Sequence, residues 1–111
     1  MSAELSQRPL SAPLTASDVD AAAVRIADVV VRTPLEFCDR LSAVTGARVY
    51  LKREDLQSVR SYKLRGAYNL LMQLTDDELR AGVVCSSAGN HAQGFALACK
   101  QMQVHGRGYA V

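Results

Sequence analysis

The fold is decided by the stretch "VVCSSAGNHAQG" at residues 83–94. Its first five residues form a short apolar run, which is typical of a strand buried on both faces. Gly89 then permits a tight turn into a helix. Along that helix, apolar residues recur at the spacing of one face, namely Ala92, Phe95, Ala96, Cys99 and Met102. A strand that leads directly into a helix is the building unit of an α/β fold.

The residues before this stretch supply a second strand and a helical connection. The segment "ARVYLKR" at 47–53 is short and β-rich, and "RSYKLRGAYNLL" at 60–71 has the pattern of an amphipathic helix that opens near Lys63. Thr75 and Glu78 are spaced as a capping box, and Gly82 is suited to end that helix. The order predicts two parallel strands joined by a right-handed crossover. We therefore expect an α/β class with a partial, three-layer open parallel sheet, in which "GRGYAV" at 106–111 begins a third strand.

The amino-terminal part is expected to hold a tail and two helices. Residues 1–16 are rich in proline, serine and alanine, which predicts a flexible tail, and residues 17–111 would form one domain. Ser17 is a candidate N-cap for a helix whose apolar stripe runs from Val19 to Val30 and which stops before Pro34. A second helix over 36–44 should end near Gly46.

Composition excludes several functions. The 111 residues carry a net charge of only +2, which by itself indicates neither nucleic acid nor an anionic membrane as a partner. The basic stretch at 51–65 is interrupted by Glu54 and Asp55, which disfavours a nucleic-acid patch. The sequence shows no secretory signal pattern and no apolar run long enough to span a bilayer.

The cysteines point to a reducing compartment rather than to a metal or a disulfide framework. There are three, an odd number, and they form no CxxC pair, so we expect a cytoplasmic protein. The spacing of Cys85, His91, Cys99 and His105 matches no common zinc pattern. We expect no metal site.

Two segments have the composition of a binding site. The turn at 86–91 should leave backbone N–H groups exposed at the positive end of a helix dipole, which favours an anion. Ser86, Ser87 and Asn90 add side-chain donors. The spacing is neither GxGxxG nor a P-loop. Tight packing without ligand binding remains an alternative explanation for such a turn.

Lys63 is the candidate reactive group. Ligands of open parallel sheets bind at the carboxyl ends of the strands, so Lys63 and Asn90, which each follow a strand, should face one crevice. The positive end of a helix dipole disfavours the charged form of an amine, and a neutral amine is what a Schiff base requires. The alternative is a solvated surface cation beside Arg60 and Arg65.

Three motifs occur in order along the chain: "LKREDLQ" at 51–57, "SYKLRGA" at 61–67 and "SSAGNHAQG" at 86–94. Together they resemble the start of the threonine dehydratases (threonine ammonia-lyases), pyridoxal-phosphate enzymes of fold type II with a tryptophan synthase beta-like fold. The resemblance implies that Lys63 holds pyridoxal 5'-phosphate covalently and later moves the substrate α-proton. It places Tyr62 beside the cofactor and Asn90 at its ring hydroxyl. The substrate carboxylate would be taken by the loop, with Ser86, Ser87, Gly89, Asn90 and His91.

The family reaction is α,β-elimination of water from L-threonine, which gives 2-oxobutanoate and ammonia and begins isoleucine biosynthesis. Members of the family are commonly homo-oligomeric. Serine dehydratase, serine racemase and threonine synthase share versions of these motifs, so L-serine is an alternative substrate.

Two parts that the resemblance leads one to expect are not found in the 111 residues. These are a glycine-rich loop for the cofactor phosphate and a later serine at the pyridine nitrogen. We therefore expect a truncated, N-terminal part of the catalytic domain, with little dehydratase activity by itself. A non-catalytic remnant or binding module is the alternative.

Overall fold

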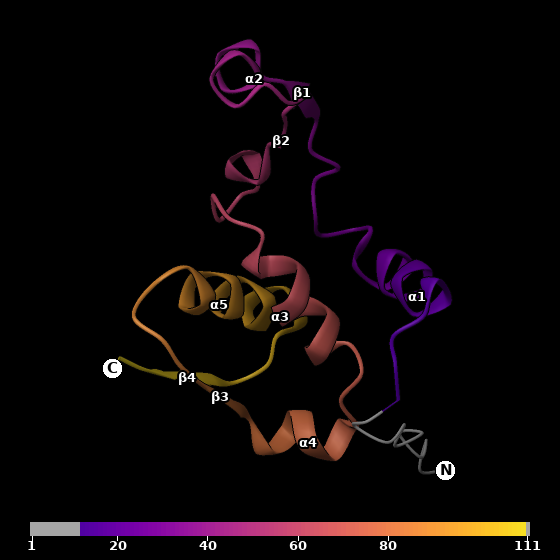
Figure 1. Ribbon diagram of the computed structural model, residues 1–111. Helices are drawn as coiled ribbons and strands as arrows, with labels where there is room; N and C mark the ends of the chain where they lie inside the picture. Colours follow the sequence, from indigo (N-terminus) through magenta and orange to yellow (C-terminus); the bar gives the residue numbers. More distant parts are fainter. Residues whose placement is uncertain (1–11, 111) are drawn as a thin grey trace.

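The computed structural model describes residues 12–110, which form a body and a projecting arm (Figure 1). The arm contains α2 (Asp39–Thr45) and the strands β1 (Leu35–Phe37) and β2 (Tyr50–Lys52), and the body contains the other labelled helices and strands. The chain extends over 55 × 31 × 27 Å. Its elements are α1 (Ala16–Ile26), β1 (Leu35–Phe37), α2 (Asp39–Thr45), β2 (Tyr50–Lys52), the 3₁₀ helix η1 (Glu54–Leu56), α3 (Lys63–Leu71), α4 (Asp76–Ala81), β3 (Val83–Ser86), α5 (Asn90–Met102) and β4 (Gly106–Tyr109).

The strands form two separate pairs rather than one sheet. β3 and β4 are parallel, with Val83 opposite Gly106 and Ser86 opposite Tyr109, and α5 connects them. The expected third strand is therefore present. β1 and β2 are antiparallel, with Leu35 opposite Lys52. We expected the strand at 47–53 to share one parallel sheet with the strand at 83–87, but β2 and β3 lie in separate pairs.

The arm explains this difference. Residues 36 and 37, which we expected within a helix over 36–44, belong to β1 instead, and residues 35–37 pair with 50–52. The rings of Phe37 and Tyr50 face each other across the pair, with centroids 5.3 Å apart and planes at 63°. Such edge-to-face pairs stabilise neighbouring strands. β2 therefore has its partner within the arm, and β3 pairs with β4.

Capping residues explain where the helices begin and end. α1 is capped by Thr15, whose hydroxyl accepts the N–H of Asp18 while the Asp18 carboxylate accepts the N–H of Thr15, so the expected N-cap at Ser17 is wrong. α1 also ends earlier than expected, at Ile26. Residues 1–11 of the expected tail lie outside the described part of the chain.

The later helix boundaries agree with expectation. α2 ends at Gly46, whose φ of 71° favours glycine. The capping box of Thr75 and Glu78 is confirmed at the start of α4, and Gly82 ends that helix with φ 87°. No helix within residues 12–110 combines the length and the apolar character that crossing a membrane requires.

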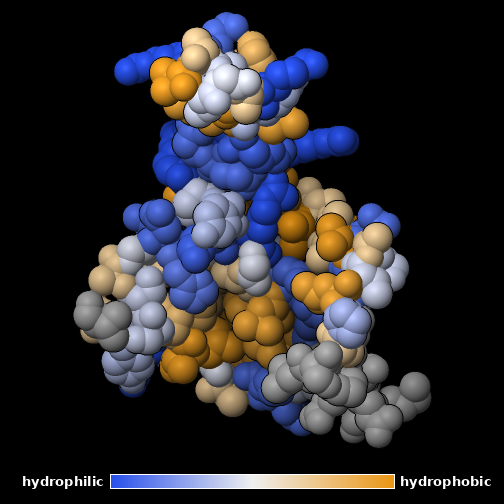
Figure 2. Space-filling model, in the orientation of Figure 1, coloured by the Kyte–Doolittle hydropathy of each residue, from blue (hydrophilic) through white to orange (hydrophobic). Residues whose placement is uncertain are grey.

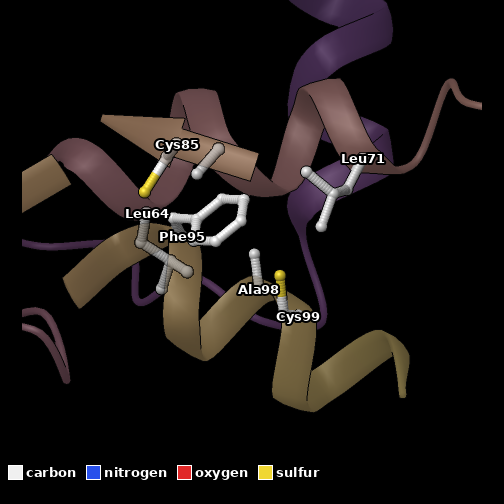
Figure 3. Close-up of a cluster of buried hydrophobic side chains, with 7 residues drawn as sticks. Leu64, Leu71, Cys85, Phe95, Ala98 and Cys99 are labelled. Carbon is white, nitrogen blue, oxygen red and sulfur yellow. The ribbon is translucent and has the colours of Figure 1, made fainter. Parts of the chain in front are cut away.

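The core lies where α3 crosses α5 (Figure 3). Leu64, which is 0% exposed, is its largest fully buried apolar side chain, and its burial contributes about 2 kcal/mol. Figure 3 shows Phe95 in the middle of the cluster. The buried set is Leu64, Ala67, Leu71, Cys85, Phe95, Ala98 and Cys99.

Only one face of the β3–β4 pair is covered by described residues. Cys85 points into the core, but Val84 is 70% exposed, so the expectation of a strand buried on both faces is wrong. Helix α5 packs on one side of the pair. Figure 2 shows apolar side chains, in orange, at the surface of the lower half of the molecule.

Candidate functional site

Lys63 is the first residue of α3 and its side chain is half-buried. The helix has no side-chain cap at Tyr62, although the Ser61 hydroxyl accepts the N–H of Lys63 at 3.4 Å. The Lys63 Nζ lies 5.1 Å from the centroid of the Tyr62 ring. It forms no ion pair with any residue in 12–110. The amine is thus held beside an aromatic ring and is not paired with a carboxylate.

Gly94 of α5 brings the start of α3 against the helix that follows the loop. A Cβ at Gly94 would lie 2.8 Å from the backbone nitrogen of Leu64 and 2.9 Å from the carbonyl carbon of Lys63. Only glycine permits this approach. Because Gly94 is about one turn beyond Asn90, the backbone of Lys63 lies near the first turns of α5. The two segments therefore come together through a helix crossing, and not along the edge of one sheet as we expected.

The loop between β3 and α5 is open to solvent. Ser86, Gly89, Asn90 and His91 are exposed, and Ser87 is half-buried. Gly89 is the N-cap of α5, with φ −131° and ψ −140°, and a Cβ there would meet no atom within 4 Å. Free space therefore lies next to the backbone at this turn.

Ser87 has a local role that the sequence did not reveal. Its hydroxyl accepts the N–H groups of Gly89 at 3.2 Å and of Ala92 at 3.3 Å, so it caps α5. The N–H groups of Asn90 and His91 have no hydrogen-bond acceptor among the described residues. Two amides thus remain available at the positive end of the helix, which is the arrangement that binds anions.

His91 lies beside an apolar groove of about 180 Å³ between α3, β3 and α5. Leu70, Val84 and Phe95 also line this groove. The predicted site residues thus form two groups, 62–63 and 86–91, which the crossing at Gly94 brings together. No hydrogen bond joins the two groups within the described residues.

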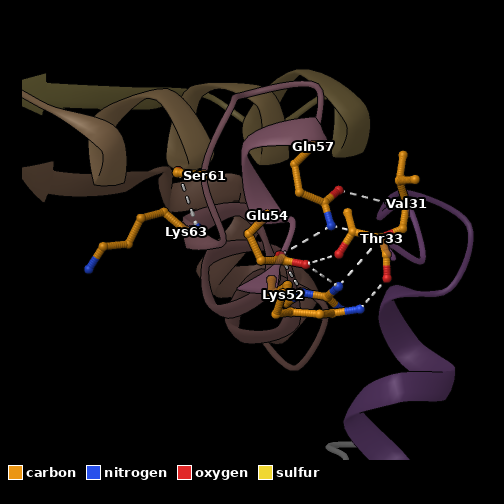
Figure 4. A network of polar contacts seen from close by, with 8 residues as sticks. Val31, Thr33, Lys52, Glu54, Gln57, Ser61 and Lys63 are labelled. Atoms are coloured by element: carbon orange, nitrogen blue, oxygen red, sulfur yellow. Dashed lines mark hydrogen bonds and ion pairs between the residues drawn. The ribbon is translucent and has the colours of Figure 1, made fainter. Parts of the chain in front are cut away.

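A network of polar contacts surrounds Glu54, close to the start of α3 (Figure 4). This network was not identified from the sequence. The Glu54 carboxylate accepts two hydrogen bonds from Arg65, by Nε at 2.8 Å and by Nη2 at 2.9 Å. It also accepts the Thr33 hydroxyl at 2.5 Å and the Gln57 amide at 3.3 Å. These donors, with Arg65 first, lower the pKa of Glu54 to about 2 against the opposing effect of burial.

Gln57 ties the same network to the chain after α1. It is 0% exposed, and its amide donates to the Val31 carbonyl at 2.7 Å and accepts the Val31 N–H at 2.9 Å. Glu54 and Gln57 both belong to the motif "LKREDLQ". The motif therefore joins residues 31–33, η1 and α3. The only hint of this linking role in the sequence was that Glu54 and Gln57 are three residues apart.

An amine without a counter-ion among residues 12–110, near an open turn of free amides in an α/β unit, defines a class of site that accepts a small anionic ligand with an electrophilic group. Within the described residues, no three His, Cys, Asp or Glu side chains lie close enough to hold a metal ion. The family model for pyridoxal-phosphate dependent enzymes matches residues 26–109. The chain belongs to this pyridoxal-phosphate dependent family.

Individual relatives agree with this assignment. The chain is 71% identical to the biosynthetic L-threonine dehydratase IlvA of Mycobacterium leprae over 109 residues, which are 98% of this chain and 26% of the relative. Its fold matches the processed threonine deaminase isoform 2 of Solanum lycopersicum with a TM-score of 0.70 and 40% identity, over 87% of this chain and 28% of that one. The serine racemase of Dictyostelium discoideum gives a TM-score of 0.82 and 34% identity, over 89% of this chain and 32% of that one. The chain thus spans about a quarter of the length of the curated relative.

Proposed function

We propose that this chain carries the lysine and the substrate loop of a threonine dehydratase, which converts L-threonine to 2-oxobutanoate and ammonia. The observation that carries the proposal is the Lys63 amine, which forms no ion pair within residues 12–110, on a residue whose backbone packs against Gly94 of the helix that follows the loop. The 71% identity to a biosynthetic threonine dehydratase supports the choice of substrate over L-serine. In that role the enzyme would serve isoleucine biosynthesis.

The residues present fit pyridoxal 5'-phosphate. Lys63 would hold the aldehyde carbon, the ring of Tyr62 would limit the positions of the amine, and Asn90 would donate to the ring hydroxyl. When bound, the cofactor supplies an electron sink for the carbanion that forms at the substrate α-carbon. The open space at Gly89 leaves room for a ligand next to the backbone.

The loop would orient the amino acid. The free N–H groups of Asn90 and His91, with the Ser86 hydroxyl, are suited to bind the substrate carboxylate, and Ser87 keeps the turn in shape by capping α5. The Lys63 amine would act as the base that removes the α-proton and later returns a proton. Glu54 is committed to Arg65 and is not a candidate base.

We also propose a cytoplasmic location and a homo-oligomeric state for the enzyme, without nucleic acid or membrane partners. Support for the location comes from three free cysteines, Cys38, Cys85 and Cys99, which suit a reducing compartment. We further propose that residues 17–111 form part of one catalytic domain.

The proposal is tested by a chimera in which this chain replaces the matching residues of the Mycobacterium leprae relative. The chimera should release 2-oxobutanoate from L-threonine, and Lys63→Ala should abolish that release. The matched control is Lys100→Ala, at an exposed lysine on α5, which should leave the rate unchanged. A chimera that keeps its activity after Lys63→Ala, or that acts on L-serine but not on L-threonine, contradicts the proposal.

A further inference from the structure

We propose that Glu54 and Arg65 form a strap that sets the direction of the Lys63 side chain, so that Glu54 is a positioning residue for the amine. This inference rests on the proposed function and deepens it.

The first step is the strength of the strap. Arg65 and Glu54 form a bidentate ion pair with two hydrogen bonds. This geometry fixes the relative orientation of a guanidinium and a carboxylate more tightly than a single hydrogen bond does. The side chains are 33% and 15% exposed, so water screens the pair less than a surface ion pair. Thr33 and Gln57 complete the shell around the carboxylate.

The second step is helix geometry. Successive residues of an α-helix are rotated by about 100°, so Lys63 and Arg65 project from α3 about 200° apart. A tie on Arg65 therefore directs Lys63 toward the other side. Figure 4 shows the Lys63 side chain extending away from the network that surrounds Glu54.

The third step is that few other contacts hold the first turn of α3 in place. α3 has no side-chain N-cap at Tyr62, and its first N–H reaches Ser61 only at 3.4 Å. Packing at Gly94 fixes the distance between the helices, and the buried Leu64 anchors one side of the first turn, so a second constraint on this turn must come from another side chain. The contact of Arg65 with Glu54 supplies that constraint.

The test measures how fast pyridoxal 5'-phosphate is fixed on each lysine by borohydride reduction, with peptide mass spectrometry as the readout. The chain has three lysines, Lys52, Lys63 and Lys100, so the last one is an internal standard. The full chain is compared with Glu54→Gln, with the milder Thr33→Val, and with Arg65→Lys, which keeps the charge but loses the fork. Asp55→Asn is the matched control, because Asp55 pairs with Arg53 and not with Arg65.

We expect Glu54→Gln to lower the ratio of Lys63 to Lys100 labelling by about tenfold, since small displacements of a reacting group have large effects on rate. Thr33→Val and Arg65→Lys should give smaller losses in the same direction, and Asp55→Asn should give none. Circular dichroism under the same conditions separates this effect from unfolding, which would make all three lysines react alike.

The outcomes separate the strap from the proposed function. If Lys63 is labelled faster than Lys100 in the unchanged chain and equally fast in folded Glu54→Gln and Thr33→Val, the strap is wrong and the function of Lys63 stands. If Lys63 shows no preference over Lys100 in the unchanged chain, the proposed function is wrong and the strap with it.

Discussion

Gly94 lies directly against the backbone of Lys63, with the position of a Cβ only 2.9 Å from the Lys63 carbonyl carbon. This contact is made by main-chain atoms, which cannot move aside as a flexible side chain does. It fixes the distance between the helix that begins with the proposed reactive amine and the helix that begins with the proposed carboxylate loop.

The first prediction concerns this crossing. Gly94→Ala should destabilise the chain by about 1–3 kcal/mol, because the added methyl group forces α3 and α5 apart. Gly66→Ala is the matched control, since a Cβ at Gly66 in α3 meets nothing within 4 Å. It should stabilise the helix by up to about 1 kcal/mol. Urea unfolding measures both, and equal stability of the two variants contradicts the account of the crossing.

The second prediction concerns the pH dependence of stability. The folded chain holds the pKa of Glu54 at about 2, below its ordinary value of 4.5. A depressed carboxyl pKa contributes stability above the unfolded value, and this contribution disappears as the pH falls from 4.5 toward 2. The loss should be on the order of 2 kcal/mol after allowance for screening. Urea midpoints over this pH range measure the slope, and Glu54→Gln should flatten it. An unchanged slope in that variant would assign the pH dependence to other groups.

The third prediction concerns the end of α5. Gln103 has a positive φ of 57° at the C-cap, which favours glycine. Gln103→Gly should raise the free energy of unfolding by about 1 kcal/mol, since it removes the strain of a left-handed side chain. The same change at Lys100, inside the helix, should lower it by a similar amount. Thermal unfolding compares the two variants. Changes of the same sign in the free energy of unfolding would contradict the assignment of Gln103 as the left-handed residue that ends α5.

The fourth prediction concerns the cysteines. Burial raises the pKa of the Cys99 thiol, and the neighbouring Cys85 adds to this effect. Cys99 should therefore react slowly with iodoacetamide, while the half-buried Cys38 on the arm reacts first. Peptide mass spectrometry after a short pulse gives the order. In denaturing urea the three rates should converge, and fast alkylation of Cys99 without urea would contradict the packing of α5.

Local signals predicted part of this structure. Thr75 with Glu78, and Gly46 and Gly82 at helix ends, act through neighbours a few residues away, so their roles could be inferred from spacing. The turn at Gly89 and the start of α3 at Lys63 were correct for the same reason. The pairing of β2 with Leu35–Phe37 could not be inferred, because strands of three residues carry little periodicity and their partners are chosen by tertiary contacts.

The polar network around Glu54 also could not be predicted from local sequence patterns. Glu54 lies 11 residues before Arg65 and 21 after Thr33, and a charged residue in a mixed-charge stretch is typical of a solvated surface. Its burial depends on three segments that meet only in the fold. The sequence correctly predicted that Lys63 begins a helix and that the loop connects a strand to a helix. The prediction that one sheet edge joins the two segments was wrong.

The most direct measurement of the central claim is the site of borohydride-fixed pyridoxal 5'-phosphate on the unchanged chain. The account predicts that the label is found on the peptide with Lys63 well before the peptides with Lys52 and Lys100. Equal labelling of the three lysines at the same rate would contradict it.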